Sequence, residues 1–288
     1  MKKRFAGIAE QYTKLEHAKI LLQSIPYDGT STWGKGADKG FAAFLDAAEN
    51  MELYDIETNT EVYEQGIHIL EELKNFTSAE DMFQKTYQRA KELLQYGKFP
   101  TFFGGEHSIS IGIIKAFYEE YADLTVLQID AHADLRPRYE GTPYNHACAM
   151  YDASRKCNLI QVGIRSMDIS EKALMDYDKT YFADEVCQGS AWEIDSIAKM
   201  TDNVYITFDL DAFDPSIMPA TGTPEPGGLT WYKAINYLKE VFEQKNVVGF
   251  DIVELAPIEG LSAPQFLTAK LYYKMLSYKF QSEIVDDE

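Results

Sequence analysis

The chain has 288 residues, 45% of them hydrophobic and 25% charged, a composition that is typical of a globular protein and excludes disorder as its main state. Its net charge of −19 excludes a basic surface for nucleic acid, and no apolar stretch approaches the roughly 18 residues that a membrane span needs. The three cysteines form no paired motif and no apolar run follows the basic start, so we expect no disulfides, no secretory signal and a cytoplasmic protein.

Short apolar runs alternate along the chain with longer segments of helical periodicity. Several of the short runs are almost wholly apolar, as strands buried on both faces of a parallel sheet must be. We therefore predict a single domain over residues 1–288, a three-layer αβα sandwich around a central, mainly parallel eight-stranded sheet. In chain order we predict strand 20–25, helix 41–48, strand 52–56, helices 61–75 and 79–96, strand 99–103, helix 109–121, strand 125–129, helix 147–155, strand 159–164, helix 169–177, strand 180–182, helix 194–199, strand 204–208, helix 232–244, strand 247–252 and helix 263–280.

Polar motifs follow four of the predicted strands at the point where each strand ends. They are GGEHS at residues 104–108, DAHADLR at 130–136, DLDAFDPS at 209–216 and DIVELAP at 251–257. In open parallel sheets the functional groups gather beyond the carboxyl ends of the strands. We therefore expect the four motifs to converge in space.

Two of these motifs have the spacing of metal ligands. Asp130, His132 and Asp134 alternate with alanines, and Asp209 and Asp211 repeat the pattern, so in extended segments each set faces one way. Buried together, such carboxylates would repel one another and protonate unless a cation neutralised them. Four carboxylates and two imidazoles are too many for one tetrahedral zinc, but they suit two divalent ions such as manganese if some carboxylates bridge. The predicted ligands are His107, Asp130, His132, Asp134, Asp209 and Asp211.

Each motif taken alone is more typical of an ordinary loop, turn or helix cap than of a metal site. Their combination favours a metal site, because His107, His132 and His146, three of the five histidines, lie within these motifs or close to them. The other two, His17 and His68, lie in charged segments of helical pattern, and we expect them at the surface.

The motifs resemble, as a set, the signatures of the ureohydrolases, the family that includes arginase, agmatinase, guanidinobutyrase, proclavaminate amidinohydrolase and formiminoglutamase. PATGTPEPGG at residues 219–228 and the glycine-rich stretch 25–40 extend the resemblance, which covers about residues 25–279. The chain departs from the family at Gly40-Phe41, where the family has Gly-Pro, and we expect that change to be neutral.

The resemblance implies the same αβα sandwich and a dinuclear manganese site, with two Mn²⁺ per subunit. It implies that Asp130 and Asp209 bridge the two ions. One ion would also be held by His107 and Asp134, and the other by His132 and Asp211.

The expected reaction is hydrolysis of a guanidinium group. A water that bridges two divalent ions is deprotonated near neutral pH, and the hydroxide attacks the central guanidinium carbon. Glu254 would hold the guanidinium through parallel N–H bonds, and Thr223 would help to position it. Asp134 would relay a proton to the leaving amine, and His146 would exchange protons with solvent. The alternatives are that Glu254 only braces a metal ligand and that His146 only caps a helix.

The substrate is expected to lack an α-amino-acid group. Arginases resemble one another in a Ser-Gly-Asn-x-His-Gly stretch that binds this group, whereas residues 142–147 here are TPYNHA. Residues 130–150 are similar to agmatinases, and the negative charge is consistent with attracting agmatine, a dication. We therefore expect a homo-oligomer, by resemblance a trimer or hexamer, that converts agmatine to putrescine and urea. The alternative is guanidinobutyrase, proclavaminate amidinohydrolase or arginase activity, which pairing of Arg136 or Arg138 with a substrate carboxylate would favour.

Two other classes of function need consideration. Metal-dependent deacetylases share this general sandwich by fold analogy, but they use one metal ion, and the present ligands are too many for that. A non-catalytic metal-binding protein would be favoured by loss of a metal carboxylate or of His146, and none is lost here.

Overall fold

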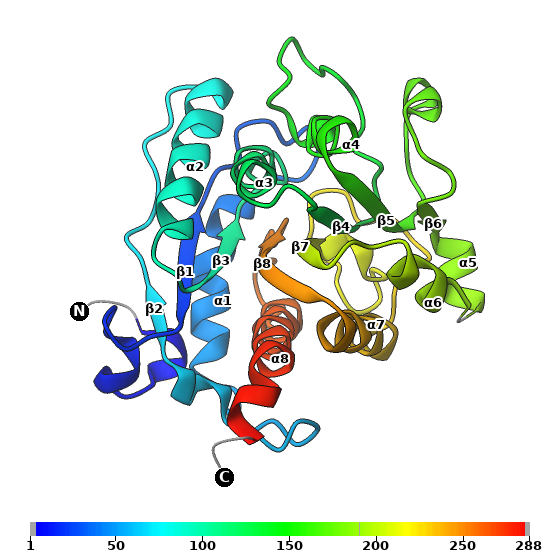
Figure 1. Ribbon diagram of the computed structural model, residues 1–288. Helices are drawn as coiled ribbons and strands as arrows, with labels where there is room; N and C mark the ends of the chain where they lie inside the picture. The colour runs from blue at the N-terminus through cyan, green and yellow to red at the C-terminus, as the bar shows by residue number, and fades with distance from the viewer. Residues whose placement is uncertain (1–3, 190, 286–288) are drawn as a thin grey trace.

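Eight parallel strands form one sheet in the order β2-β1-β3-β8-β7-β4-β5-β6 in the computed structural model, which describes residues 4–189 and 191–285 (Figure 1). The predicted fold class is confirmed, and every strand pairing in the described residues is parallel. The strands are β1 (Ile20–Ile25), β2 (Ile67–Ile69), β3 (Phe99–Gly104), β4 (Thr125–Ile129), β5 (Asn158–Ile164), β6 (Thr180–Phe182), β7 (Asn203–Asp209) and β8 (Asn246–Val253).

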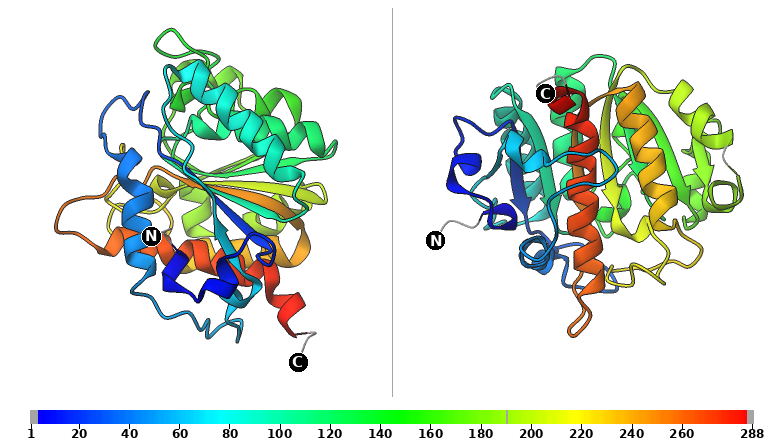
Figure 2. Two further views of the ribbon diagram at one scale, coloured as in Figure 1. Left: turned by 90° about the vertical axis from the view of Figure 1, so that its left-hand side faces the viewer. Right: turned by 90° about the horizontal axis from the view of Figure 1, so that it is seen from below.

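Helices cover both faces of this sheet, which Figure 2 shows edge-on between them. One face carries α2 (Ala79–Leu94), α3 (Ile109–Glu120) and α4 (Ala153–Lys156), and the other carries α1 (Gly40–Ala48), α5 (Ala183–Gln188), α6 (Ala191–Ala198), α7 (Trp231–Gln244) and α8 (Ala263–Val285). The short 3-10 helices are η1 (Phe5–Gly7), η2 (Glu10–Thr13), η3 (Ala37–Lys39), η4 (Val62–Gln65), η5 (His146–Cys148), η6 (Ile169–Ala173) and η7 (Leu210–Ala212).

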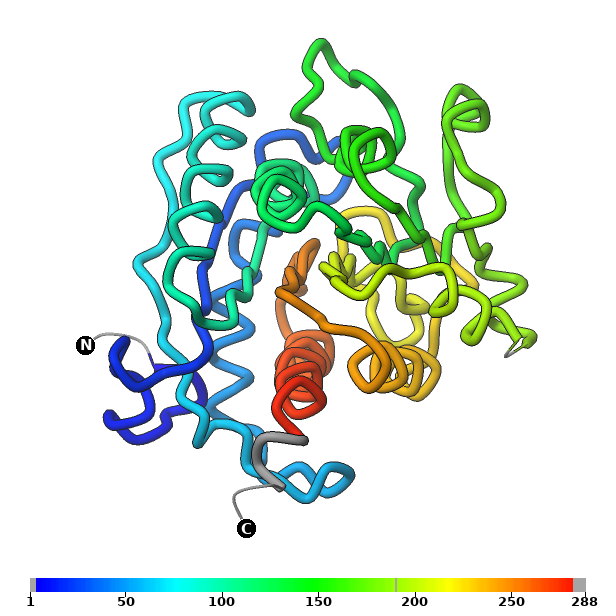
Figure 3. The backbone as a smooth tube through the Cα atoms, viewed as in Figure 1, coloured from blue at the N-terminus to red at the C-terminus, as the bar shows by residue number. Residues whose placement is uncertain are grey.

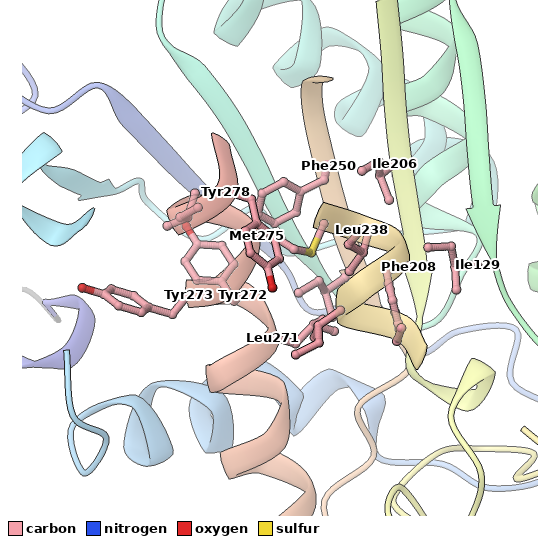
Figure 4. Close-up of a cluster of buried hydrophobic side chains, with 14 of the residues drawn as sticks. Ile129, Ile206, Phe208, Leu238, Phe250, Leu271, Tyr272, Tyr273, Met275 and Tyr278 are labelled. Carbon is pink, nitrogen blue, oxygen red and sulfur yellow. The ribbon is translucent and has the colours of Figure 1, made fainter. Parts of the chain in front are cut away.

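A separate apolar core lies on each face of the sheet. Strands such as β1 and β3 are buried at every residue, because their alternating side chains enter both cores. Phe250 of β8 and Tyr272 of α8 belong to the larger core, which Figure 4 shows in close-up. Phe117 of α3 belongs to the other. The two cores hold the sheet rigid and leave its carboxyl edge free to carry polar loops.

Two predictions for the β2 edge of the sheet are wrong. The predicted strand 52–56 is irregular chain, and the edge strand is β2, inside the predicted helix 61–75. The physical reason is local: Gly66 has a φ of 77° and ends η4, and Ile67 and Ile69 then alternate with His68 in the period of a strand. His68 is partly buried there and its Nδ1 lies 2.7 Å from the carbonyl oxygen of Thr13, whereas His17 is exposed as expected.

Two further helix predictions are wrong, and one helix was not predicted. The predicted helix 147–155 is η5 followed by a turn and the single-turn α4, and the predicted helix 169–177 is only η6. The short helix α5 was not predicted, because its six residues are too few for a periodic signal. Within the described residues, no helix combines the length and apolar character needed to cross a membrane.

Candidate active site

The four polar motifs meet at the carboxyl ends of the central strands. Three of the motifs follow β3, β7 and β4, and the fourth begins inside β8, which contains Asp251. These strands are neighbours in the order β3-β8-β7-β4. All four are parallel, so their carboxyl ends lie on the same side. Figure 3 traces the backbone through these segments in the view of Figure 1. The convergence predicted from the motifs is therefore present.

His107 lies at the centre of a buried carboxylate cluster. Its Nδ1 is 3.0 Å from Asp130 Oδ2, 3.1 Å from Asp134 Oδ2 and 3.3 Å from Asp209 Oδ2. Each of these four side chains is at least 90% buried. Despite the short distances, Nδ1 makes no hydrogen bond of acceptable geometry. A lone pair that faces a cation explains this arrangement, whereas a hydrogen-bonded imidazole does not.

A second cluster adjoins the first. His132 Nδ1 lies 2.9 Å from Asp211 Oδ2 and 3.7 Å from Asp130 Oδ1. Asp130 thus faces both histidines, one with each oxygen. Asp209 adjoins this second cluster, because its Oδ1 accepts a hydrogen bond of 2.8 Å from the backbone N–H of Asp211. The two clusters are contiguous and share at least one carboxylate.

The pKa shifts of the buried carboxylates indicate that the two clusters favour a bound cation. Burial, with Asp211 and Asp130 close by, raises the pKa of Asp209 well above its usual range. Burial also raises the pKa of Asp134 to about 7. Such shifts are the cost of packing carboxylates together, and a bound divalent ion would remove it by neutralising them. The nitrogen and oxygen donors therefore fit one or more divalent metal ions, and ligand atoms of each cluster lie within 4.8 Å of one another.

A buried hydrogen-bond chain orients His107 from behind. His107 Nε2 lies 2.9 Å from Thr207 Oγ1, which donates a 2.7 Å hydrogen bond to Asp251 Oδ1. Tyr205 donates to the other oxygen of Asp251, also at 2.7 Å. Since the hydroxyl proton of Thr207 goes to Asp251, His107 must donate from Nε2 and keep its Nδ1 lone pair for the cluster. No role was predicted for Thr207 or for Asp251, the first residue of the DIVELAP motif, although polar residues inside two buried strands were a usable signal.

Glu254 lies directly after β8, beside the His107 cluster. Its Oε1 accepts a 2.8 Å hydrogen bond from the backbone N–H of His107, and its own N–H donates to the carbonyl of Gly105. Burial and the nearby carboxylates of Glu106 and Asp211 raise its pKa well above the usual range. Glu254 and Asp134 both have positive φ angles, 71° and 53°. Strained backbone of this kind persists where the surrounding structure requires the side chain in one place.

The clusters form the floor of a pocket of about 290 Å³. Asp130 is fully buried beneath it, and the other predicted site residues line it: His107, His132, Asp134, His146, Asp209, Asp211, Thr223 and Glu254. The structure thus brings all nine residues to one place.

Polar groups also line the outer wall of the pocket. Arg136 is held by Glu171 at 3.6 Å and by Asp168 at 3.9 Å, and its guanidinium stacks on Tyr139. Arg138 does not line the pocket and donates to the carbonyl of Gly141. The one arginine at the pocket is therefore already paired with two carboxylates, which weakens the case for a substrate carboxylate there.

Comparisons with known proteins agree with this geometry. The arginase family model matches residues 18–277. N(1)-aminopropylagmatine ureohydrolases of Synechocystis sp. and Thermus thermophilus are 33% and 34% identical, over 96% and 94% of this chain and 94% and 93% of theirs. The agmatinase of Pyrococcus horikoshii is 27% identical over 91% of this chain and 92% of its own.

Solved structures show the same fold over nearly the whole chain. The agmatine ureohydrolase of Thermoplasma volcanium matches with a TM-score of 0.88 and 28% identity, covering 98% of this chain and 97% of that one. Arginase from Bacillus cereus matches with a TM-score of 0.76 and 22% identity, covering 89% and 97%. The chain therefore belongs to the arginase family and is an amidinohydrolase of the agmatinase-like kind.

Proposed function

We propose that this protein hydrolyses the guanidinium group of agmatine, or of agmatine extended by an N(1)-aminopropyl group, to urea and a linear amine. The observation that carries the proposal is the position of Glu254, a carboxylate that lines the pocket beside the His107 cluster. Only one of its oxygens is bonded to His107, so the other can accept an N–H of a guanidinium.

The metal centre of this proposal consists of two Mn²⁺ ions. His107 and Asp134 would hold one ion, His132 and Asp211 would hold the other, and Asp130 and Asp209 would bridge them. Asp130 supports this assignment, since it faces both histidines. When bound, the ions would supply Lewis-acid activation of a water molecule.

The side chains around the metal centre would orient the substrate and move protons. Glu254 would accept an N–H of the guanidinium, and Thr223 at the exposed end of the pocket would help to position it. Cleavage of a carbon–nitrogen bond releases an amine that needs a proton. Asp134 would relay that proton, and His146 would exchange protons between the pocket and solvent.

The choice between the two substrates rests on the relatives. Four proteins named N(1)-aminopropylagmatine ureohydrolase are 32–34% identical to this chain, above the 27–29% of three proteins named agmatinase, which favours the extended amine. That substrate would leave a linear triamine, whereas agmatine would leave putrescine. Both substrates lack a carboxylate, in agreement with the sequence TPYNHA at residues 142–147.

A side-by-side urea assay tests the proposal. The manganese-loaded protein is given agmatine, N(1)-aminopropylagmatine, arginine and 4-guanidinobutyrate, and kcat/KM is measured for each. A tenfold preference corresponds to about 1.4 kcal/mol of differential transition-state binding. We expect one of the first two to be preferred by at least that factor, and Asp209→Ala to abolish urea release. A preference for 4-guanidinobutyrate would overturn the proposed substrate. If none of the four compounds released urea, the proposed function itself would be wrong.

We also propose that the protein assembles as a trimer or hexamer of identical chains. Support comes from a mainly apolar surface pocket whose lining includes Trp231, Phe266 and Leu267. Light scattering that showed a monomer would contradict the proposed assembly.

A further inference from the structure

A chain of three polar residues connects the glycine-rich stretch after β1 to the pocket. Thr30 Oγ1 donates a 2.8 Å hydrogen bond to Glu106 Oε1. The same hydroxyl oxygen lies 3.0 Å from the backbone nitrogen of His146 and 3.2 Å from its ring Nδ1. Glu106 is fully buried and Thr30 is 8% exposed, so water does not compete for these bonds.

Glu106 is surrounded by hydrogen-bond donors. Its Oε1 accepts from the backbone N–H and the hydroxyl of Thr30 and from the hydroxyl of Ser108, and its Oε2 accepts from the backbone N–H of Ser108. Four donors on two oxygens are what an ionised carboxylate accepts. Burial raises the pKa of Glu106, and these bonds oppose that rise.

The hydroxyl of Thr30 then has its proton and both lone pairs accounted for. Its one proton goes to Glu106, the closer and charged partner. One lone pair accepts the backbone N–H of His146, and the contact to Nδ1 can be a hydrogen bond only if Nδ1 carries a proton.

We propose that Glu106 and Thr30 act together as positioning residues that fix His146 as the Nδ1–H tautomer, with the lone pair on Nε2. The proposal rests on the proposed function, in which His146 handles protons in the pocket. Within the described residues nothing is hydrogen-bonded to Nε2, and His146 lines the pocket. Nε2 is therefore the ring atom that remains for substrate or water.

This tautomer defines what His146 does. A neutral imidazole with a free Nε2 accepts a hydrogen bond or a proton, and it donates one only after it has taken one up. His146 thus begins each turnover as an acceptor, and Thr30 holds the ring in that state.

Neutron diffraction of the manganese-loaded protein in D₂O at neutral pH tests the tautomer without any substrate. We expect deuterium on His146 Nδ1, none on Nε2, and the deuteroxyl of Thr30 directed at Glu106. Deuterium on Nε2, or on a carboxyl oxygen of Glu106, would overturn the proposal and leave the proposed function untouched.

Kinetics of two Thr30 variants test the consequence. In Thr30→Val the acceptor for Nδ1–H is lost, and we expect kcat for urea release to fall about 10- to 100-fold, with KM changed less than about twofold. Thr30→Ser keeps the hydroxyl and should restore kcat to within about threefold of the wild type. Thr86 is a buried threonine of α2 whose hydroxyl, among the residues that the structure describes, bonds only to Met82, so Thr86→Val is the matched control and should keep full activity.

The variants separate a positioning role from a purely structural one. Manganese content and the melting temperature are measured alongside kcat. The positioning role would be overturned if kcat fell as far in Thr30→Ser as in Thr30→Val. It would also be overturned if the fall in kcat of Thr30→Val were explained by a lower manganese content. If Thr30→Val does not fold, the neutron experiment and Thr30→Ser still decide the question.

Discussion

Replacement of the Thr207 hydroxyl, which lies behind the His107 cluster, by a methyl group should weaken metal binding. Thr207→Val keeps the shape of the side chain in β7 but deletes the oxygen that lies 2.9 Å from His107 Nε2. His107 then loses the partner that keeps its Nδ1 free of a proton. Groups that orient a metal-binding histidine typically change metal affinity 10- to 100-fold. We expect Mn²⁺ affinity to fall by about that factor, equivalent to about 1.4–2.8 kcal/mol.

The same substitution has a second, separable effect on the fold. Asp251 Oδ1 loses the 2.7 Å bond from Thr207, although Tyr205 still donates to Oδ2. An unpaired buried acceptor costs about 1–3 kcal/mol. We therefore expect the free energy of unfolding of the metal-free protein to fall by about 1–3 kcal/mol relative to the wild type.

Calorimetric titration of metal-free protein with Mn²⁺ and urea unfolding in chelator measure the two effects. Thr86→Val is again the control, because in the described part of the chain its hydroxyl is hydrogen-bonded only to the sulfur of Met82. An Mn²⁺ affinity within twofold of the wild type, with stability lowered as expected, would refute the orientation of His107 through Thr207.

Three further substitutions test the pocket and the core. Glu254→Gln keeps an oxygen for the His107 N–H but removes the charge, so kcat/KM for the guanidino substrate should fall about 10- to 100-fold while manganese content is unchanged. Gly34→Ala places a methyl group 2.6 Å from the carbonyl oxygen of Gly222, so the loop with the 219–228 sequence must shift and KM should rise severalfold. Phe44→Ala removes a fully buried ring from the larger core, and urea unfolding should show a loss of about 3–5 kcal/mol with little change in KM.

Each of these expectations can fail clearly. Near-normal turnover by Glu254→Gln would make Glu254 a brace for His107 instead of a substrate ligand. An unchanged KM in Gly34→Ala would mean that the 219–228 loop does not position the substrate. A loss below about 1 kcal/mol in Phe44→Ala would mean that the core collapses to fill the space.

The strands and the metal motifs were predictable because they are local patterns. Apolar runs such as 125–129 and 204–208 are too uniform to be anything but buried strands, and each is followed at once by alternating ligand-type residues. Short elements were less predictable. The edge strand β2 has three residues, and a glycine with positive φ decides where it begins, which no periodic pattern reveals.

The sequence by itself determined the fold class, the family and the side chains that meet at the carboxyl edge of the sheet, because spacing along a strand dictates which face a side chain occupies. The tertiary structure decided the partners of those side chains. Thr207 and Asp251 meet across neighbouring strands, and Thr30, Glu106 and His146 come from three segments that are far apart in the sequence. Hydrogen bonds between residues so distant in sequence depend on strand order and loop packing, and these emerge only when the chain has folded.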